Sequence, residues 1–172
     1  EKERVKLAFL KKDADFIIDT SKLLTRELRQ ELEKIFFKHQ EYCNMFVTVL
    51  SFGFKYGIPE DADLVFDVRF LPNPYYSEDL RLLTGEDQSV RDYVMQGGTC
   101  AQFLDKLYDM MDFLLPNYIN EGKNQLVVAV GCTGGKHRSV TVARALCAHL
   151  TARAEYGIKI EHRDIDKDNK RK

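Results

Sequence analysis

The stretch Val127–Val142, VVAVGCTGGKHRSVTV, predicts a strand, a tight turn and a helix in immediate succession. An apolar run, Leu126–Val130, ends in a turn that contains three glycines, and a helix-forming stretch, Val140–Leu150, begins directly after it. Short apolar runs bounded by glycine are typical of buried strands, and the alternation of strand and helix is typical of α/β domains.

The turn has the chemistry of an anion site. Glycines allow the backbone to curl so that several N–H groups face one point, and a helix N-terminus adds positive potential there. Lys136, His137 and Arg138 supply cationic donors. The combination is typical of a loop that binds a phosphate group or another compact anion.

Strand-like and helix-like segments alternate around this motif. The sequence predicts strands over Asn44–Phe52, Ala62–Phe70 and Gly157–His162, and helices over Glu86–Met95 and Thr99–Tyr118, the last kinked or ended by Pro116. We therefore expect a Rossmann-like α/β fold, with a mainly parallel sheet flanked by helices and a phosphate-binding loop at a strand-to-helix junction.

Ligands of such sheets bind beyond the carboxyl ends of the strands. The predicted ends are Ser51–Tyr56, Asp67–Arg69 and Gly131–Arg138, and all three are polar or rich in glycine. We expect them to converge on one crevice.

The N-terminal part has a separate strand–helix pattern. The sequence predicts a strand over Ala14–Thr20 and a helix over Thr25–Phe37. The polar segment Phe37–Cys43 separates both from the rest of the chain. We divide the chain into residues 1–40 and residues 44–172.

Composition limits the classes of protein. With 172 residues, 44% hydrophobic residues and a net charge of −1, the chain suits an ordinary globular domain whose overall charge steers no partner. It has no apolar run of about 20 residues and no signal-peptide core, so we expect a cytoplasmic protein without membrane contact. The four cysteines have no metal-ligand spacing, and we expect neither a metal site nor disulfides.

Four interpretations of the central loop compete. A nucleotide P-loop requires G-x-x-x-x-G-K-[ST], but Val130 stands at the first glycine and His137 at the Ser/Thr position. The other interpretations are a cysteine phosphatase, an anion-binding loop without chemistry, and a purely structural turn.

The phosphatase interpretation depends on the C-x5-R spacing of Cys132 and Arg138, followed by Ser139. A thiolate at a helix N-terminus beside cations is a competent nucleophile. The histidine that usually precedes the cysteine of tyrosine phosphatases is replaced by Gly131, and the general acid has only two candidates, Asp67 and Asp79.

Two long segments, GCTGGKHRSV (residues 131–140) and SFGFKYGIPEDADLVFDVRFLPNPYY (residues 51–76), resemble the RapZ/YvcJ family of bacterial nucleotide-binding proteins. The resemblance covers about Ala14–Arg163 and implies that residues 44–172 are the C-terminal ligand-binding α/β domain. Residues 1–40 would be the last strand and helix of an N-terminal P-loop domain, without its Walker A motif. ATP or GTP binding and weak ATPase or GTPase activity would then belong to the full-length protein, and this chain would be neither an enzyme nor in need of a cofactor.

The resemblance also implies a regulatory domain that controls amino-sugar and cell-envelope precursor metabolism. Its ligand would be a phosphorylated amino sugar such as glucosamine-6-phosphate, and Cys132 would have no catalytic role. The expected partners are small regulatory RNA and a protein, and a homo-oligomer is expected. Carried over by position, the ligand-binding residues would be Thr133, Gly134, Gly135, Lys136, His137, Arg138, Ser139, Asp67, Arg69, Lys55, Tyr56 and Tyr75.

Two departures affect these expectations. Tyr56 and Tyr75 stand where the enterobacterial pattern has histidine, so the ligand could be another phosphosugar or a nucleotide sugar. RNA binding would depend on a basic tail that three aspartates interrupt; its cations are Lys167, Lys170, Arg171 and Lys172.

Overall fold

The computed structural model describes residues 14, 16–21, 23–25, 27–28, 31–32, 45–153 and 156–167. The chain divides into two compact units, Glu1–Tyr42 and Cys43–Lys172. That the first unit is a remnant of a nucleotide-binding domain stays a prediction.

The predicted strand Ala14–Thr20 is wrong where the structure describes it, because Ala14 and residues 16–20 have no strand conformation. Asp19 instead accepts hydrogen bonds from the backbone N and the Oγ of Ser21, at 3.0 and 2.6 Å, in a local turn. The described residues between Thr25 and Leu32 are helical, as predicted. Glu27 accepts a hydrogen bond from the backbone N of Leu24 at 2.9 Å, which caps this helix.

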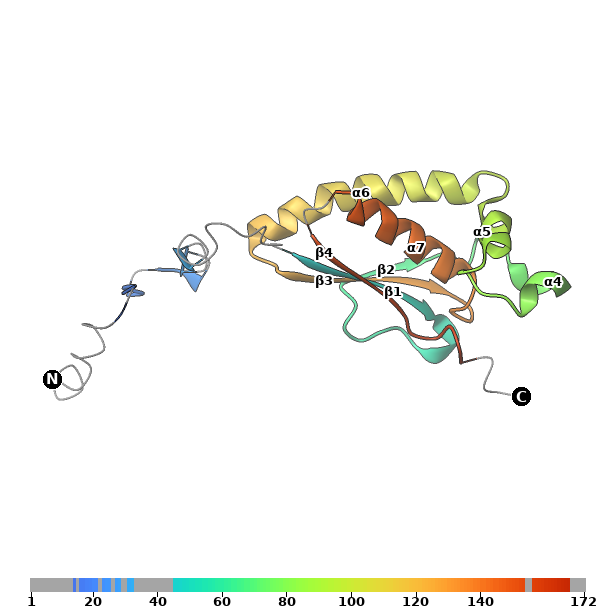
Figure 1. The fold of residues 1–172 in the computed structure, drawn as a ribbon, viewed down its shortest axis with the longest axis horizontal. Helices are drawn as coiled ribbons and strands as arrows, with labels where there is room; N and C mark the ends of the chain where they lie inside the picture. The colour runs from blue at the N-terminus through green and yellow to red at the C-terminus, as the bar shows by residue number, and fades with distance from the viewer. Residues whose placement is uncertain are drawn as a thin grey trace. The chain divides into compact units, whose positions relative to one another are not determined.

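The second unit has one sheet of four parallel strands in the order β2-β3-β1-β4, which confirms the predicted α/β fold (Figure 1). Its elements are β1 (Phe46–Gly53), η1 (Phe54–Tyr56), β2 (Leu64–Asp67), η2 (Pro74–Tyr76), α4 (Glu78–Arg81), α5 (Gln88–Met95), α6 (Thr99–Glu121), β3 (Gln125–Cys132), α7 (Arg138–Thr151) and β4 (Gly157–His162).

The core lies between the sheet and the two long helices, α6 and α7, which Figure 1 shows over the same face. Period-2 alternation turns one set of strand residues toward these helices, and period 3–4 turns one stripe of each helix toward the strands. Each fully buried side chain contributes roughly 1.5–3 kcal/mol. The central core residues are Val47, Val49, Leu126, Val128, Val130, Leu104, Leu107, Met111, Leu115, Val142, Leu146 and Leu150.

Helix α6 continues through Pro116 to Glu121, so Pro116 does not end the helix, which extends past the predicted end at Tyr118. Nδ2 of Asn117 donates a hydrogen bond of 2.6 Å to the carbonyl of Phe113, whereas the carbonyl that loses its helical donor to Pro116 is that of Asp112. Leu115 is fully buried next to Pro116, and core packing holds the helix on both sides of the proline.

Candidate functional site

The carboxyl ends of β1, β2 and β3 meet at one edge of the sheet. Gly53 pairs with Cys132, and Asp67 pairs with Gly131, so the loop of residues 133–137 leaves β3 between its two neighbours. The convergence predicted for the strand ends is therefore confirmed.

Glycine is required where this loop rests on β1. A Cβ added to Gly53 would lie 2.6 Å from the carbonyl carbon of Gly134. Gly135 has φ +75°, and a Cβ there would lie 2.6 Å from the backbone N of Gly53. The contact between loop and strand is thus made backbone to backbone, which only glycine allows.

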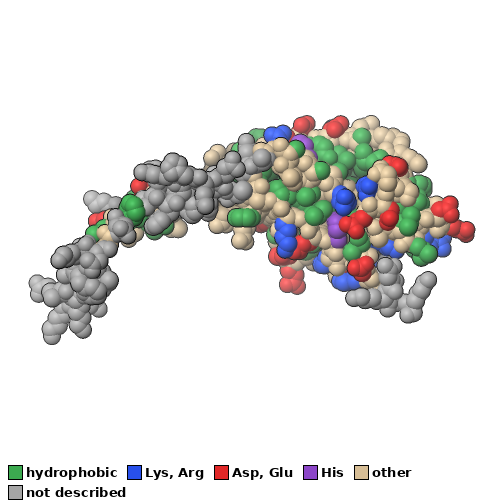
Figure 2. Space-filling model, in the orientation of Figure 1, with side chains coloured by type: hydrophobic (Ala, Val, Ile, Leu, Met, Phe, Trp, Pro, Cys, Tyr) green, Lys and Arg blue, Asp and Glu red, His purple; other side chains and the backbone are tan. Residues whose placement is uncertain are grey.

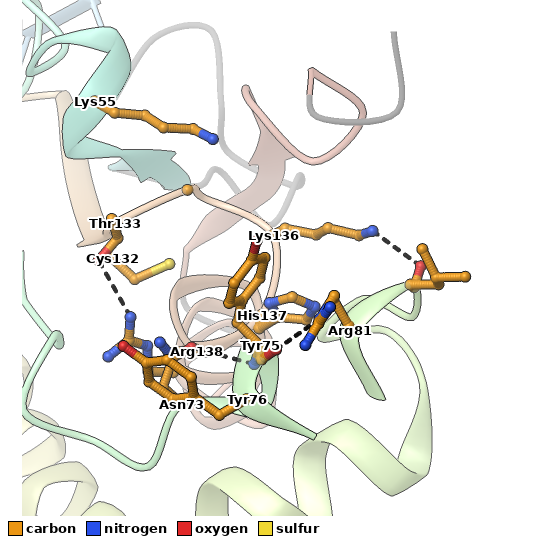
Figure 3. A pocket seen from close by; sticks show the side chains of 12 residues that line it. Lys55, Asn73, Tyr75, Tyr76, Arg81, Cys132, Thr133, Lys136, His137 and Arg138 are labelled. Carbon is orange, nitrogen blue, oxygen red and sulfur yellow. Dashed lines mark hydrogen bonds between the residues drawn. The ribbon is translucent and has the colours of Figure 1, made fainter. Parts of the chain in front are cut away.

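A cavity of about 810 Å³ opens above the loop (Figure 3). Its walls come from η1, from the end of β3 and the loop that follows it, from η2 and α4, and from the start of α7. The lining residues are Lys55, Asn73, Tyr75, Tyr76, Arg81, Leu82, Cys132, Thr133, Gly134, Lys136, His137 and Arg138.

Two buried nitrogens in this lining have no hydrogen-bond partner among the described residues: Nε2 of His137 and Nε of Arg138. Their side chains are only 8% and 5% exposed. Both belong to the N-terminus of α7, a helix of 14 residues, where the dipole favours negative charge. A buried donor without a partner is costly, so an anion bound here would satisfy it.

The rest of the Arg138 guanidinium is held by the protein. Nη1 donates to the carbonyls of Arg69 and Leu71, at 2.6 and 3.3 Å, and Nη2 donates to Oγ1 of Thr133 at 3.3 Å. Nζ of Lys136 donates to the carbonyl of Leu82 at 2.9 Å. These bonds fix the cations in position before any ligand arrives.

The lining is strongly cationic. It contains Lys55, Arg81, Lys136 and Arg138, and no aspartate or glutamate. Burial lowers the pKa of His137, and Lys136 lowers it further, whereas backbone hydrogen bonds at Leu83 and Arg81 oppose the shift. The net pKa of His137 lies below its usual 6.5, which favours the neutral imidazole, and Nε2 can donate a hydrogen bond only when that nitrogen carries a proton.

The structure places seven of the predicted ligand residues in the lining: Lys55, Tyr75, Thr133, Gly134, Lys136, His137 and Arg138. Asp67 and Arg69 are not lining residues; they form a bidentate ion pair with each other, with Nη2 2.6 Å from Oδ2. The side-chain hydrogen bond from Arg69 lowers the pKa of Asp67. Tyr56 also lies outside the lining, and Nζ of Lys55 and of Lys167 lies over its ring, at 4.9 and 4.8 Å.

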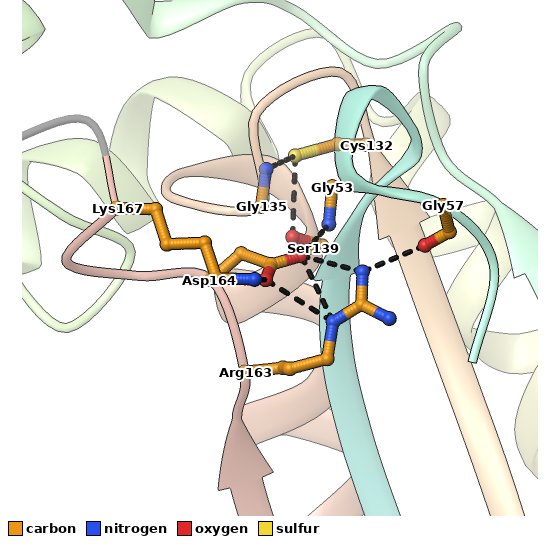
Figure 4. A network of polar contacts seen from close by, with 8 residues as sticks. All are labelled: Gly53, Gly57, Cys132, Gly135, Ser139, Arg163, Asp164 and Lys167. Atoms are coloured by element: carbon orange, nitrogen blue, oxygen red, sulfur yellow. Dashed lines mark hydrogen bonds and ion pairs between the residues drawn. The ribbon is translucent and has the colours of Figure 1, made fainter. Parts of the chain in front are cut away.

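Gly135 and Ser139 contact the sulfur of Cys132 and do not line the cavity. The backbone N of Gly135 lies 3.3 Å and Oγ of Ser139 lies 3.2 Å from the Cys132 sulfur (Figure 4). This is the arrangement that the phosphatase interpretation requires around its nucleophile. Its acid is missing from the lining, because Asp67 is paired with Arg69 and Asp79 does not line the cavity.

Sequence reasoning missed one polar network beside the loop. Asp164 is fully buried and accepts a hydrogen bond from the backbone N of Gly53 at 2.8 Å, and it pairs with Arg163 and Lys167 at 2.8 and 2.6 Å (Figure 4). Lys167, a predicted RNA contact, is thus bound to Asp164. The other tail cations, Lys170, Arg171 and Lys172, lie outside the described residues.

Sequence reasoning also missed part of the cavity wall, namely Asn73, Tyr76, Arg81 and Leu82. The available signal was the pair of prolines at Pro72 and Pro74, which stiffens the chain just after β2 and so projects the next residues from a fixed turn.

Acidic, basic and hydrophobic side chains are interspersed over the visible face of the second unit, with no extended basic surface there (Figure 2). No group of three metal-ligating side chains occurs within the described ranges. Of the helices that the structure describes, none is both long and apolar enough to cross a membrane.

Together, the sheet and its loop define an α/β domain with a cationic, glycine-rich loop at the carboxyl edge of a parallel sheet. Residues 45–166 match the family model described as "RapZ C-terminal domain". The chain belongs to this family, as the resemblance in sequence predicted.

Three relatives, each from a bacterium, are similar to almost the whole chain. A "Nucleotide-binding protein" of Agathobacter rectalis is 64% identical over 166 residues, which cover 96% of this chain and 57% of that protein. A "Nucleotide-binding protein" of Lachnoclostridium phytofermentans is 60% identical over 97% of this chain and 58% of that protein. One of Acetivibrio thermocellus is 54% identical over 98% of this chain and 57% of that protein. The chain thus spans somewhat more than half the length of these relatives.

Proposed function

We propose that the second unit is a regulatory domain that binds a phosphorylated sugar, with the phosphate group held by the loop of residues 133–138. The observation that carries the proposal is the pair of buried nitrogens without partners, Nε of Arg138 and Nε2 of His137, at the N-terminus of α7. A tetrahedral anion there would accept a hydrogen bond from Nε of Arg138, and one from Nε2 of His137 when that nitrogen carries a proton, and it would gain from the helix dipole.

The sugar would occupy the cavity above the loop. Tyr75 and Asn73 offer hydroxyl and amide groups to sugar hydroxyls, and the tyrosine ring offers an apolar face. Glucosamine-6-phosphate is the ligand that the family resemblance implies, in the control of amino-sugar and cell-envelope precursor metabolism. Its ammonium group would have to bond to neutral acceptors, because the lining contains no carboxylate.

Calorimetric titration with inorganic phosphate, glucosamine-6-phosphate and glucosamine tests this proposal. The two phosphate compounds should bind, and glucosamine should not. Lys136→Ala should weaken phosphate binding by about ten-fold, because it removes a charge-assisted contact. Lys159→Ala is the matched control, since Lys159 is an exposed lysine outside the lining that pairs with Glu161.

Titration would count against the proposal if phosphate compounds did not bind, or if Lys136→Ala and Lys159→Ala had the same effect.

RNA binding, a protein partner and a homo-oligomeric state stay predictions from the resemblance, and a cytoplasmic location stays a prediction from composition. The RNA prediction would be supported by a salt-dependent gel shift that weakens when residues 170–172 are removed, since phosphate contacts release counterions. A shift that does not change on their removal would count against this tail as the RNA site.

A further inference from the structure

The cavity has an aromatic wall that a phosphate in the loop does not use. Tyr75 and Tyr76 project from η2, where Oδ1 of Asn73 accepts a hydrogen bond from the backbone N of Tyr75 at 3.3 Å. Pro74 occupies the first position of this turn and is buried. Proline and the Asn73 cap together hold the two rings at fixed places at the cavity wall (Figure 3).

Both rings are exposed although they line a cavity. The side chains of Tyr75 and Tyr76 are 54% and 79% exposed, and their ring centroids are 6.1 Å apart with the planes at 79°. Nε of Arg81 donates to the carbonyl of Tyr75 at 3.0 Å, and its guanidinium carbon lies 5.0 Å from the Tyr75 ring centroid. An exposed ring beside a fixed guanidinium is a surface on which a planar ring of a ligand can stack.

The cavity also has more cationic side chains, and has them more widely spread, than one phosphate group can contact. Lys136 and Arg138 lie at the loop, whereas Arg81 and Lys55 lie on other walls of the same cavity (Figure 3). Four cations and no carboxylate line the cavity, and such a lining favours a ligand with more than one anionic group. A cavity of about 810 Å³ lies at the upper end of the range that holds drug-sized ligands.

We propose that the cavity contains a second subsite, formed by Tyr76, Tyr75 and Arg81, that takes a nucleobase. The preferred ligand class would then be a sugar joined through a diphosphate to a nucleoside. The inference depends on the proposed function, because the diphosphate would be anchored at the same loop. It does not involve a Walker loop, since the chain contains no G-x-x-x-x-G-K-[ST] motif.

Calorimetric titration of the 172-residue chain with ADP, UDP, inorganic pyrophosphate and ribose 5-phosphate tests the proposal. At least one nucleoside diphosphate should bind about ten-fold more tightly than pyrophosphate, the gain expected of one base stacked on an aromatic ring. Tyr76→Ala should remove most of this advantage and change pyrophosphate affinity less than about two-fold. Tyr76→Phe should retain it, and the exposure of Tyr76 means that both variants should fold.

The proposal is overturned if neither nucleotide binds more tightly than pyrophosphate, or if Tyr76→Ala weakens all ligands equally. In either case the proposed function stands if phosphate still binds and still depends on Lys136. If no phosphate compound binds at all, the proposed function and this inference both fail.

Discussion

The guanidinium of Arg138 donates a hydrogen bond of 2.6 Å to the backbone carbonyl of Arg69, across 69 residues of sequence. This bond joins the N-terminus of α7 to the chain that follows β2, and it leaves Nε of Arg138 toward the cavity without a partner. One side chain therefore fixes the site and keeps a donor ready for an anion.

Arg138→Lys should separate these two roles. A lysine keeps the positive charge but cannot bond to Arg69, Leu71 and Thr133 together while also presenting a further N–H. We expect phosphate affinity to fall by at least ten-fold and the free energy of unfolding to fall by about 1–2 kcal/mol. Calorimetry and urea denaturation measure the two quantities, and unchanged phosphate affinity would contradict the assignment.

Asp164 should be a major stabiliser of the β1 end. Asp164→Ala removes the acceptor of the backbone N of Gly53 and the anionic partner of Arg163 and Lys167. We expect the free energy of unfolding to fall by about 3 kcal/mol. Asp164→Asn, which keeps an acceptor, should lose less. Glu161→Gln, in an exposed ion pair, is the control and should change stability by less than about 0.5 kcal/mol.

The same residue predicts acid sensitivity. Burial raises the pKa of Asp164, but the hydrogen bonds from Arg163, Lys167 and Gly53 outweigh it, and the net pKa lies below the usual 3.8. A carboxyl with a lowered pKa in the folded state contributes stability above 3.8 that is lost as the pH falls below that value. In melting curves between pH 6 and pH 2.5, wild type should lose more stability than Asp164→Asn; equal losses would be the contrary result.

Anion binding should take up a proton at His137. Burial holds the pKa of this imidazole below 6.5, and a bound anion would raise it by favouring the charged form. Linkage then requires sulfate, which does not titrate near neutrality, to bind more tightly as the pH falls from 8 to 6. His137→Gln should flatten this dependence, whereas an equally steep dependence in the variant would place the proton elsewhere.

Cys132 should not be a catalytic nucleophile. The cavity lining has no carboxylic acid to protonate a leaving group, so we expect no turnover of an aryl phosphate. Cys132→Ser should retain phosphate affinity within about two-fold. Turnover by wild type that disappears in Cys132→Ser would instead support the phosphatase interpretation.

The sequence was sufficient to predict the sheet and the loop because both depend on local signals. Val127 and its neighbours form an apolar run next to glycines, and Gly157–His162 is a strand with the predicted bounds. Helix α6 passes through Pro116, however, because core packing on both sides outweighs the local cost of proline. The strand predicted at 14–20 had a strand-like composition, but Ala14 and residues 16–20 have no strand conformation, and Asp19 bonds to Ser21 in a local turn.

The site residues could be predicted only where they are neighbours in the sequence. Lys136, His137 and Arg138 are adjacent in sequence and stand at the predicted start of a helix, so the sequence alone indicated them as anion ligands. Asp67 was predicted to bind the ligand because a carboxylate suits an ammonium group or sugar hydroxyls. In the structure it pairs with Arg69, two residues away, and does not line the cavity. Tyr76 and Arg81 enter the lining through the turn at Pro74, a tertiary arrangement that composition and spacing do not specify.

A crystal structure of the chain with glucosamine-6-phosphate is the sharpest test of phosphate binding by the loop. We expect the phosphate group in the loop of residues 133–138, within hydrogen-bond distance of Nε of Arg138 and Nε2 of His137, with the sugar toward Tyr75. A saturated crystal with no phosphate in this loop, or with the phosphate bound elsewhere, would contradict it.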